Sequence, residues 1–83
     1  MHVRRFEVVA NHDVWDVLDA DHVVGIHRRK PEAVRQAVAA ARASAPARLA
    51  VVAADGHIEN ITDFDADGAA TAEPTFRGRA PDR

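Results

Sequence analysis

Residues 31–45 of the chain read PEAVRQAVAAARASA, and this stretch decides the fold. Pro31 favours a helix start, because the first helical residue needs no backbone N–H donor. Glu32 follows in the first turn, where the helix dipole favours a negative charge. Apolar residues recur at helical spacing, at Val34, Ala37, Val38, Ala41 and Ala45. The pattern predicts a helix over residues 31–45 whose small side chains pack closely on a sheet.

Three segments before this helix predict β-strands: residues 3–10, 14–19 and 23–27. Two-residue turns between them would pair Val8 with Val17, and Val17 with Val24, in antiparallel registers. Under these registers one sheet face carries the larger apolar residues, namely Phe6, Val8, Trp15, Val17, Val24 and Ile26. A shift by one residue would scatter them over both faces. We therefore expect a three-stranded antiparallel meander whose apolar face lies beneath the helix.

The sequence after the helix predicts a second hairpin. Residues 48–54 are apolar and rich in Val, as in a buried strand. Asp55-Gly56 is a strong hairpin turn signal, and residues 57–62 form the returning strand. From residue 65 onward the chain is small, polar and interrupted by Pro and Gly, with Phe76 as its single aromatic residue. That composition is typical of a disordered tail.

These elements together predict an α+β fold. We expect a small antiparallel sheet with one helix packed on one face, in the order β-β-β-α-β-β. A single domain would occupy residues 1–64 and the disordered tail residues 65–83. A domain of this size buries a small core, so self-association is a reasonable expectation.

Several short motifs occupy matching places in a known family. They are Trp15-Asp16-Val17, Glu32-Ala33, Ala37, Ala41-Arg42 and Asp55-Gly56-His57-Ile58. Over about residues 3–62 the chain resembles the short bacterial and phage proteins catalogued as domain of unknown function 2188. It differs from them at Lys30, where the family usually has a Thr or Ser helix cap, and at Asp19 and Asp21, where the family is often more basic. The resemblance implies the same order of strands and helix, and it brings no established activity.

Composition narrows the classes of function. The formal net charge is -2, which argues against non-specific nucleic-acid binding as the main role. The chain has no Cys, which excludes disulfides and thiolate metal sites. The first residues lack the apolar run of a signal peptide, and no apolar run has the length of a membrane span. We expect a cytoplasmic protein without a membrane partner.

Catalytic and metal-binding patterns are weak. Among the five histidines, which are His2, His12, His22, His27 and His57, none has the helical spacing of a metal site. Residues 63–68 begin like a calcium loop, but Pro74 stands where the loop needs its closing Glu. No Ser or Lys lies in a recognisable nucleophile setting. We therefore predict no enzyme activity, no cofactor and no metal site.

Two surfaces are candidates for binding. The registers place Val9, Leu18 and Val23 on the sheet face away from the helix, where an apolar patch would need a partner. Five cations could form an anion or nucleic-acid site near the helix start: Arg28, Arg29 and Lys30, with Arg4 and Arg5. The first surface favours a small non-catalytic binding or protein-interaction module, with a homodimer through a sheet edge or face as one option. The second favours an anion- or nucleic-acid-binding accessory protein, which is the alternative.

Overall fold

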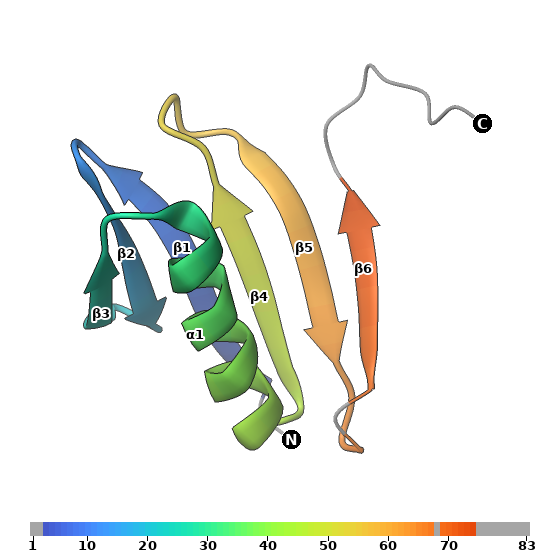
Figure 1. Ribbon diagram of the computed structural model, residues 1–83. Helices are drawn as coiled ribbons and strands as arrows, with labels where there is room; N and C mark the ends of the chain where they lie inside the picture. Colours follow the sequence, from blue (N-terminus) through green and yellow to red (C-terminus); the bar gives the residue numbers. More distant parts are fainter. Residues whose placement is uncertain (1–2, 68, 75–83) are drawn as a thin grey trace.

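The computed structural model of the protein describes residues 3–67 and 69–74. These ranges form two layers, a helix and a mixed sheet (Figure 1). The elements are β1 (Arg4–Asn11), β2 (Val14–Asp19), β3 (His22–His27), α1 (Lys30–Ala43), β4 (Ala47–Val52), β5 (Ile58–Phe64) and β6 (Ala70–Pro74). In space the strands run β3-β2-β1-β4-β5-β6, and α1 lies on one face. The predicted α+β fold is confirmed, with β6 as an addition.

The centre of the sheet differs from the expected antiparallel pattern. β1 and β4 are parallel, while every other described neighbouring pair is antiparallel. Because β1, β2 and β3 form a meander, β3 runs in the same direction as β1, and therefore as β4. A connection between parallel strands needs a long crossover, and α1 supplies it by passing over β2 and β1. The prediction of a wholly antiparallel sheet is therefore wrong at its central pair.

The core lies between α1 and the sheet face beneath it. Its larger residues come from the strands: Phe6, Val8, Val17, Leu49, Val51 and Phe64. On the helix side, Ala33, Ala37 and Ala41 are fully buried, and Val34 and Val38 flank them at partial burial. Alanine side chains four residues apart let the helix backbone approach the sheet closely. Ala33 was not among the helix residues predicted to face the sheet, and it is the first of them along the chain.

The register of the first hairpin matches the sequence prediction, and that of the second hairpin corrects it. Val8 faces Val17 as expected. Between β2 and β3, however, Val17 faces Gly25, because a β-bulge makes Val24 an extra residue. Ile26 then faces Asp16 and is 63% exposed, so Val24 and Ile26 do not join the core. A bulge changes side-chain parity, which regular alternation cannot anticipate.

Gly25 lies opposite Val17, where the predicted register placed the larger Val24. A Cβ atom at Gly25 would lie 2.0 Å from Oε1 of Gln36 on α1. The Gln36 side chain uses this space to donate a hydrogen bond to the Val24 carbonyl, at 3.2 Å, and to bond the His27 ring at 2.6 Å. Helix α1 is therefore fixed to edge strand β3 by polar contacts, where the larger strand side chains are absent.

The prediction of a disordered tail over residues 65–83 is wrong for residues 70–74, which form strand β6. β6 pairs with β5 in an antiparallel register from Phe64↔Ala70 to Asn60↔Pro74. The turn before it is closed by Asp65, whose carboxylate accepts hydrogen bonds from the backbone N–H groups of Asp67 and Ala69. The domain thus extends beyond the predicted boundary at residue 64. Phe76 and the remainder of the predicted tail lie outside the described residues.

Overpacking at the helix–sheet contact gives the first prediction. Ala37→Leu inserts a larger side chain at a fully buried position and is expected to destabilise the fold by about 1–3 kcal/mol. Ala39→Leu, on the exposed side of the same helix, is expected to change stability by no more than about 0.5 kcal/mol. Urea unfolding at one protein concentration, followed by fluorescence of the single Trp, Trp15, measures both. Equal effects of the two substitutions would contradict the close packing of α1.

Candidate interaction face

The sheet has a second face that α1 does not cover. Side chains alternate along each strand, so residues next to the core positions point to the opposite side. In the described part of the chain no element lies over that side (Figure 1). We call it the open face. Its side chains form rows across the strands, because the paired registers align them.

The first row crosses the sheet near the end of β1 and β4. From one side to the other it reads Ile26, Asp16, Val9, Val52 and Ile58. Ile26 and Ile58 are 63% and 41% exposed, and the two central valines are half-buried by their neighbours. Four of the five residues are apolar. Asp16 is the exception, and its carboxylate accepts a hydrogen bond from the Asn11 amide at 2.9 Å.

The second row lies two residues further along the strands. It reads Val23, Leu18, Glu7, Ala50 and Ile61. Val23 is 52% exposed, and Leu18 and Ile61 are half-buried. Glu7, in the middle, has no ion-pair partner among the described residues. The two rows together give the open face an apolar band that spans β3 to β5.

The structure places all three of the sequence candidates Val9, Leu18 and Val23 on this face. It adds Val52 and Ile61, which the sequence did not single out. Residues 48–54 are apolar at almost every position, so alternation could not show which side chains of β4 face the helix. Only the burial of Leu49 and Val51 assigns Val52 to the open face.

The third row is charged and ends the apolar band. It reads Arg5, Arg48, Asp63 and Thr71. Arg48 donates two hydrogen bonds to the Asp63 carboxylate, at 2.7 and 3.1 Å, in the paired geometry typical of a guanidinium and a carboxylate. These bonds lower the pKa of Asp63 below its ordinary value. Arg5 has no such carboxylate partner within the described ranges.

A shallow hollow lies at this charged end. Its volume is about 440 Å³, and Val3, Arg5, Pro46, Arg48, Asp63 and Thr71 are among the residues that line it. Two of its carboxylates are already satisfied, since Asp63 is held by Arg48 and Asp65 by backbone N–H groups. The hollow therefore adjoins the charged row, and Arg5 in its lining has no carboxylate partner among the described residues.

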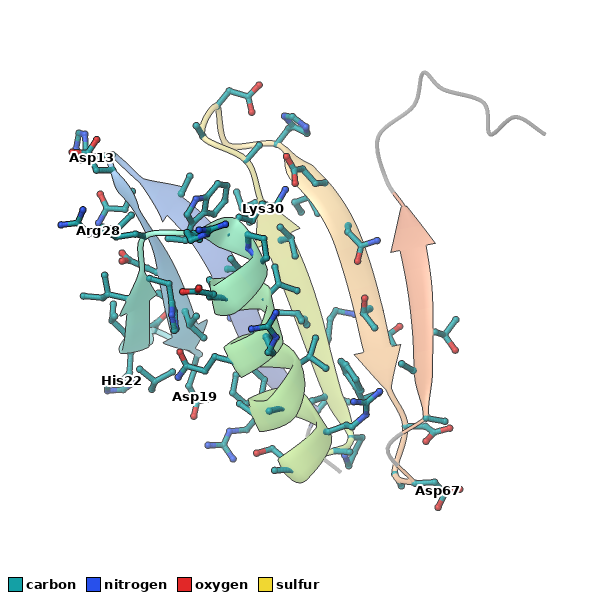
Figure 2. The ribbon with its side chains drawn as sticks, in the orientation of Figure 1. Asp13, Asp19, His22, Arg28, Lys30 and Asp67 are labelled. Atoms are coloured by element: carbon teal, nitrogen blue, oxygen red, sulfur yellow. The ribbon has the colours of Figure 1, made fainter. Side chains whose placement is uncertain are left out.

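The five cations expected to form an anion site are not gathered. Arg28 and Lys30 lie at the end of the sheet near Asp13, whereas Asp19, which binds Arg4 at 2.8 Å, lies toward the other end (Figure 2). Lys30 is also engaged, because it pairs with Glu59 and its ammonium lies 5.4 Å from the centre of the Trp15 ring. The remaining two members, Arg29 and Arg5, are exposed.

A second β-bulge, in β5, brings Glu59 to Lys30. Val51 faces Asn60 and Val52 faces Ile58, which leaves Glu59 as an extra residue in β5. The Glu59 carboxylate reaches the Lys30 ammonium at the first residue of α1. The contact is partly exposed, so its main effect is to tie the first residue of the helix to β5 rather than to add much stability.

The described histidines and acidic residues do not form a metal site. Among residues 3–67 and 69–74, no three His, Asp or Glu side chains lie close enough together to hold a metal ion. His57 bonds Asp55 in the hairpin turn, at 2.5 Å between Nδ1 and Oδ1, and the backbone N–H of His57 also bonds that carboxylate. These contacts, the backbone one above all, lower the pKa of Asp55.

Comparisons with known proteins returned no match to a family model, to a curated protein or to a solved structure. The resemblance to domain of unknown function 2188 therefore stays a prediction. In the described ranges, the 14-residue α1 has neither the length nor the apolar character that a membrane-spanning helix requires.

The Arg48–Asp63 pair gives a prediction about pH. Because the pKa of Asp63 is lowered in the folded state, the pair stabilises the fold above the ordinary Asp pKa. That contribution is lost as the pH falls through the lowered value. Arg48→Gln should raise the Asp63 pKa toward its ordinary value, as measured by a carboxyl-carbon NMR titration. Asp55, whose pKa is lowered by His57, serves as the internal control and should not move. An unchanged Asp63 pKa would show that Arg48 is not its partner in solution.

Proposed function

We propose that the protein is a small, non-catalytic protein-interaction module and that the open face is its binding surface. The observation that carries the proposal is the apolar band on a sheet face that no described element covers. Soluble proteins rarely leave a broad apolar patch in water unless it binds something. The core side is already closed by α1, so a partner has one face of the sheet available.

The composition of the face suits a protein partner. Its centre holds half-buried aliphatic residues such as Val9, Val52 and Leu18, and its end carries the charged row with Arg5 and Arg48. An apolar centre with a polar rim is the usual anatomy of a protein–protein interface. Val23 and Ile26 on edge strand β3 extend the apolar surface to the border of the sheet.

The alternative, an anion- or nucleic-acid-binding accessory protein, draws less support from the geometry. It uses the basic run Arg28, Arg29 and Lys30 before the helix, with Arg4 and Arg5 as an extension. Lys30 is instead bound to Glu59, and Arg4 to Asp19. Nucleic-acid binding depends on several cations that contact phosphates together. The described residues offer two exposed arginines, Arg28 and Arg29, beside the helix start.

A capture experiment with matched variants tests the proposal. Leu18→Lys places a charge in the centre of the apolar band, and Ala39→Lys places the same charge on the exposed side of α1. Tagged chains are used to capture binding proteins from the native host, together with untagged copies of the chain itself. We expect Leu18→Lys to lose the proteins that the unchanged chain captures, and Ala39→Lys to keep them. Equal capture by both variants, with both folded by Trp15 fluorescence, would contradict the proposal.

A further inference from the structure

We infer that the occupant of the open face is a second copy of this chain, packed face to face about a two-fold axis that runs along the strands between β1 and β4. The inference rests on the proposed function of the open face and adds the partner and its orientation. It follows from how the residues of the rows are placed relative to the centre of the sheet.

The sheet is divided evenly by the line between β1 and β4. On one side lie β1, β2 and β3, and on the other lie β4, β5 and β6. A two-fold axis along this line places β1 over the partner's β4 and β2 over the partner's β5. Two sheets packed in this way keep their strands within about 30° of each other and lie about 10 Å apart, as in β-sandwiches.

This symmetry matches apolar residues with apolar residues at the centre of the face; further out, Asp16, which is bonded to Asn11, faces the partner's Ile58. Val9 and Val52 are neighbours across the central line, so Val9 faces the partner's Val52. Leu18 and Ile61 lie in one row, each one strand further from the line, so Leu18 faces the partner's Ile61. A two-fold interface repeats each contact, because the same patch serves both copies. Each pair of residues therefore contributes twice.

The same arrangement supplies a cation to Glu7. Glu7 is half-buried in the middle of the apolar band and lacks an ion-pair partner among the described residues. Across the axis it faces the partner's Ala50, a small residue, and the partner's Arg48 stands two positions along that strand. Long Glu and Arg side chains bridge such an offset. The central acid of each copy thus lies near the Arg48–Asp63 pair of the other, whose guanidinium can contact both carboxylates.

A two-fold axis across the strands would fit poorly. An axis through the middle row would lay the row of Val9 and Val52 on the partner's row of Arg5 and Arg48. Burying those guanidinium groups against aliphatic side chains carries a desolvation penalty without compensating hydrogen bonds. The axis along the strands keeps the charged rows of both copies together at one end. There Arg5 lies opposite the partner's Arg48, but both guanidinium groups are exposed to water and Arg48 keeps its pair with Asp63.

The size of the face is sufficient for a stable dimer. The described chain extends 34 and 33 Å along its two longer axes and 18 Å along the third, which spans the helix and sheet layers. The sheet face is one broad side of that shape, so it has room for the roughly 800 Å² per partner that a standard interface buries, with the apolar band at its centre. The helix side, by contrast, closes its core with alanines, and the larger buried side chains of that core come from the strands. A second sheet would give this small domain a second apolar core.

An isotope-filtered NMR experiment on the full chain tests the arrangement directly. A sample is prepared from equal amounts of isotope-labelled and unlabelled protein, so that Overhauser effects between the two kinds of chain are selected. Within one chain Leu18 and Ile61 lie three strand spacings apart, about 14 Å, which is beyond the range of the effect. We expect cross-peaks between the Leu18 methyls of one chain and the Ile61 methyls of the other.

Sedimentation equilibrium supplies the second measurement. Ile61→Lys should raise the dimer dissociation constant at least about 100-fold, because two-fold symmetry introduces two charges and removes two apolar side chains. Ala39→Lys should leave it unchanged. Ile61→Thr keeps a β-branched residue and provides a milder test if the Lys variant does not fold; it too should weaken the dimer.

The outcomes separate this inference from the proposed function. A dimer that is weakened by Ile61→Lys but shows Leu18–Leu18 cross-peaks in place of Leu18–Ile61 would overturn the orientation and leave the open face as the binding surface. A chain that stays monomeric at millimolar concentration would overturn the second copy as occupant. Capture of other proteins that is lost in Leu18→Lys would then still support the proposed function. A dimer that is insensitive to both Ile61 variants would overturn the inference.

Discussion

The close contact between α1 and one face of the sheet is the constraint on which the rest of the structure depends. Ala33, Ala37 and Ala41 bring the helix backbone near the strands, and the larger side chains of the core come from the sheet. Because α1 runs over β1 and β2 to reach β4, it fixes the parallel pairing at the centre of the sheet. The same crossover leaves the opposite face uncovered in the described structure. The apolar band on that face is therefore left exposed by the topology.

Two irregularities adapt the strands to this crossover. The bulge at Val24 shifts β3 so that Gly25 lies beneath the helix, and Gln36 fills the space with hydrogen bonds to Val24 and His27. The bulge at Glu59 turns a carboxylate toward Lys30 at the first residue of the helix. Both bulges lie outside the central strand pair. They let polar contacts hold the helix where the apolar core ends, and they also direct Ile26 and Ile58 to the open face.

Much of the fold could be predicted from local patterns. The alternation of β1 and β2 gave the correct pairing of Val8 with Val17, and the alanine spacing predicted α1, which spans Lys30–Ala43 instead of residues 31–45. The parallel contact of β1 with β4 could not be inferred, because pairing between distant strands leaves no local pattern. β6 was missed because its composition resembles a tail and its stability comes from pairing with β5. Of the candidate site, Val9, Leu18 and Val23 followed from alternation, whereas Val52 and Ile61 required the burial pattern of β4 and β5.

If a second copy covers the open face, the dimer shields the side chains of that face from solvent. The most direct test is the accessibility of its methyl groups to a soluble paramagnetic probe, measured by NMR over a wide range of protein concentration. We expect the methyls of Val52 and Ile61 to be protected at high concentration, like those of core residues Val8 and Val17, and to become accessible on dilution. If Val52 and Ile61 are equally accessible at every concentration while Val8 and Val17 stay protected, no second copy covers the open face.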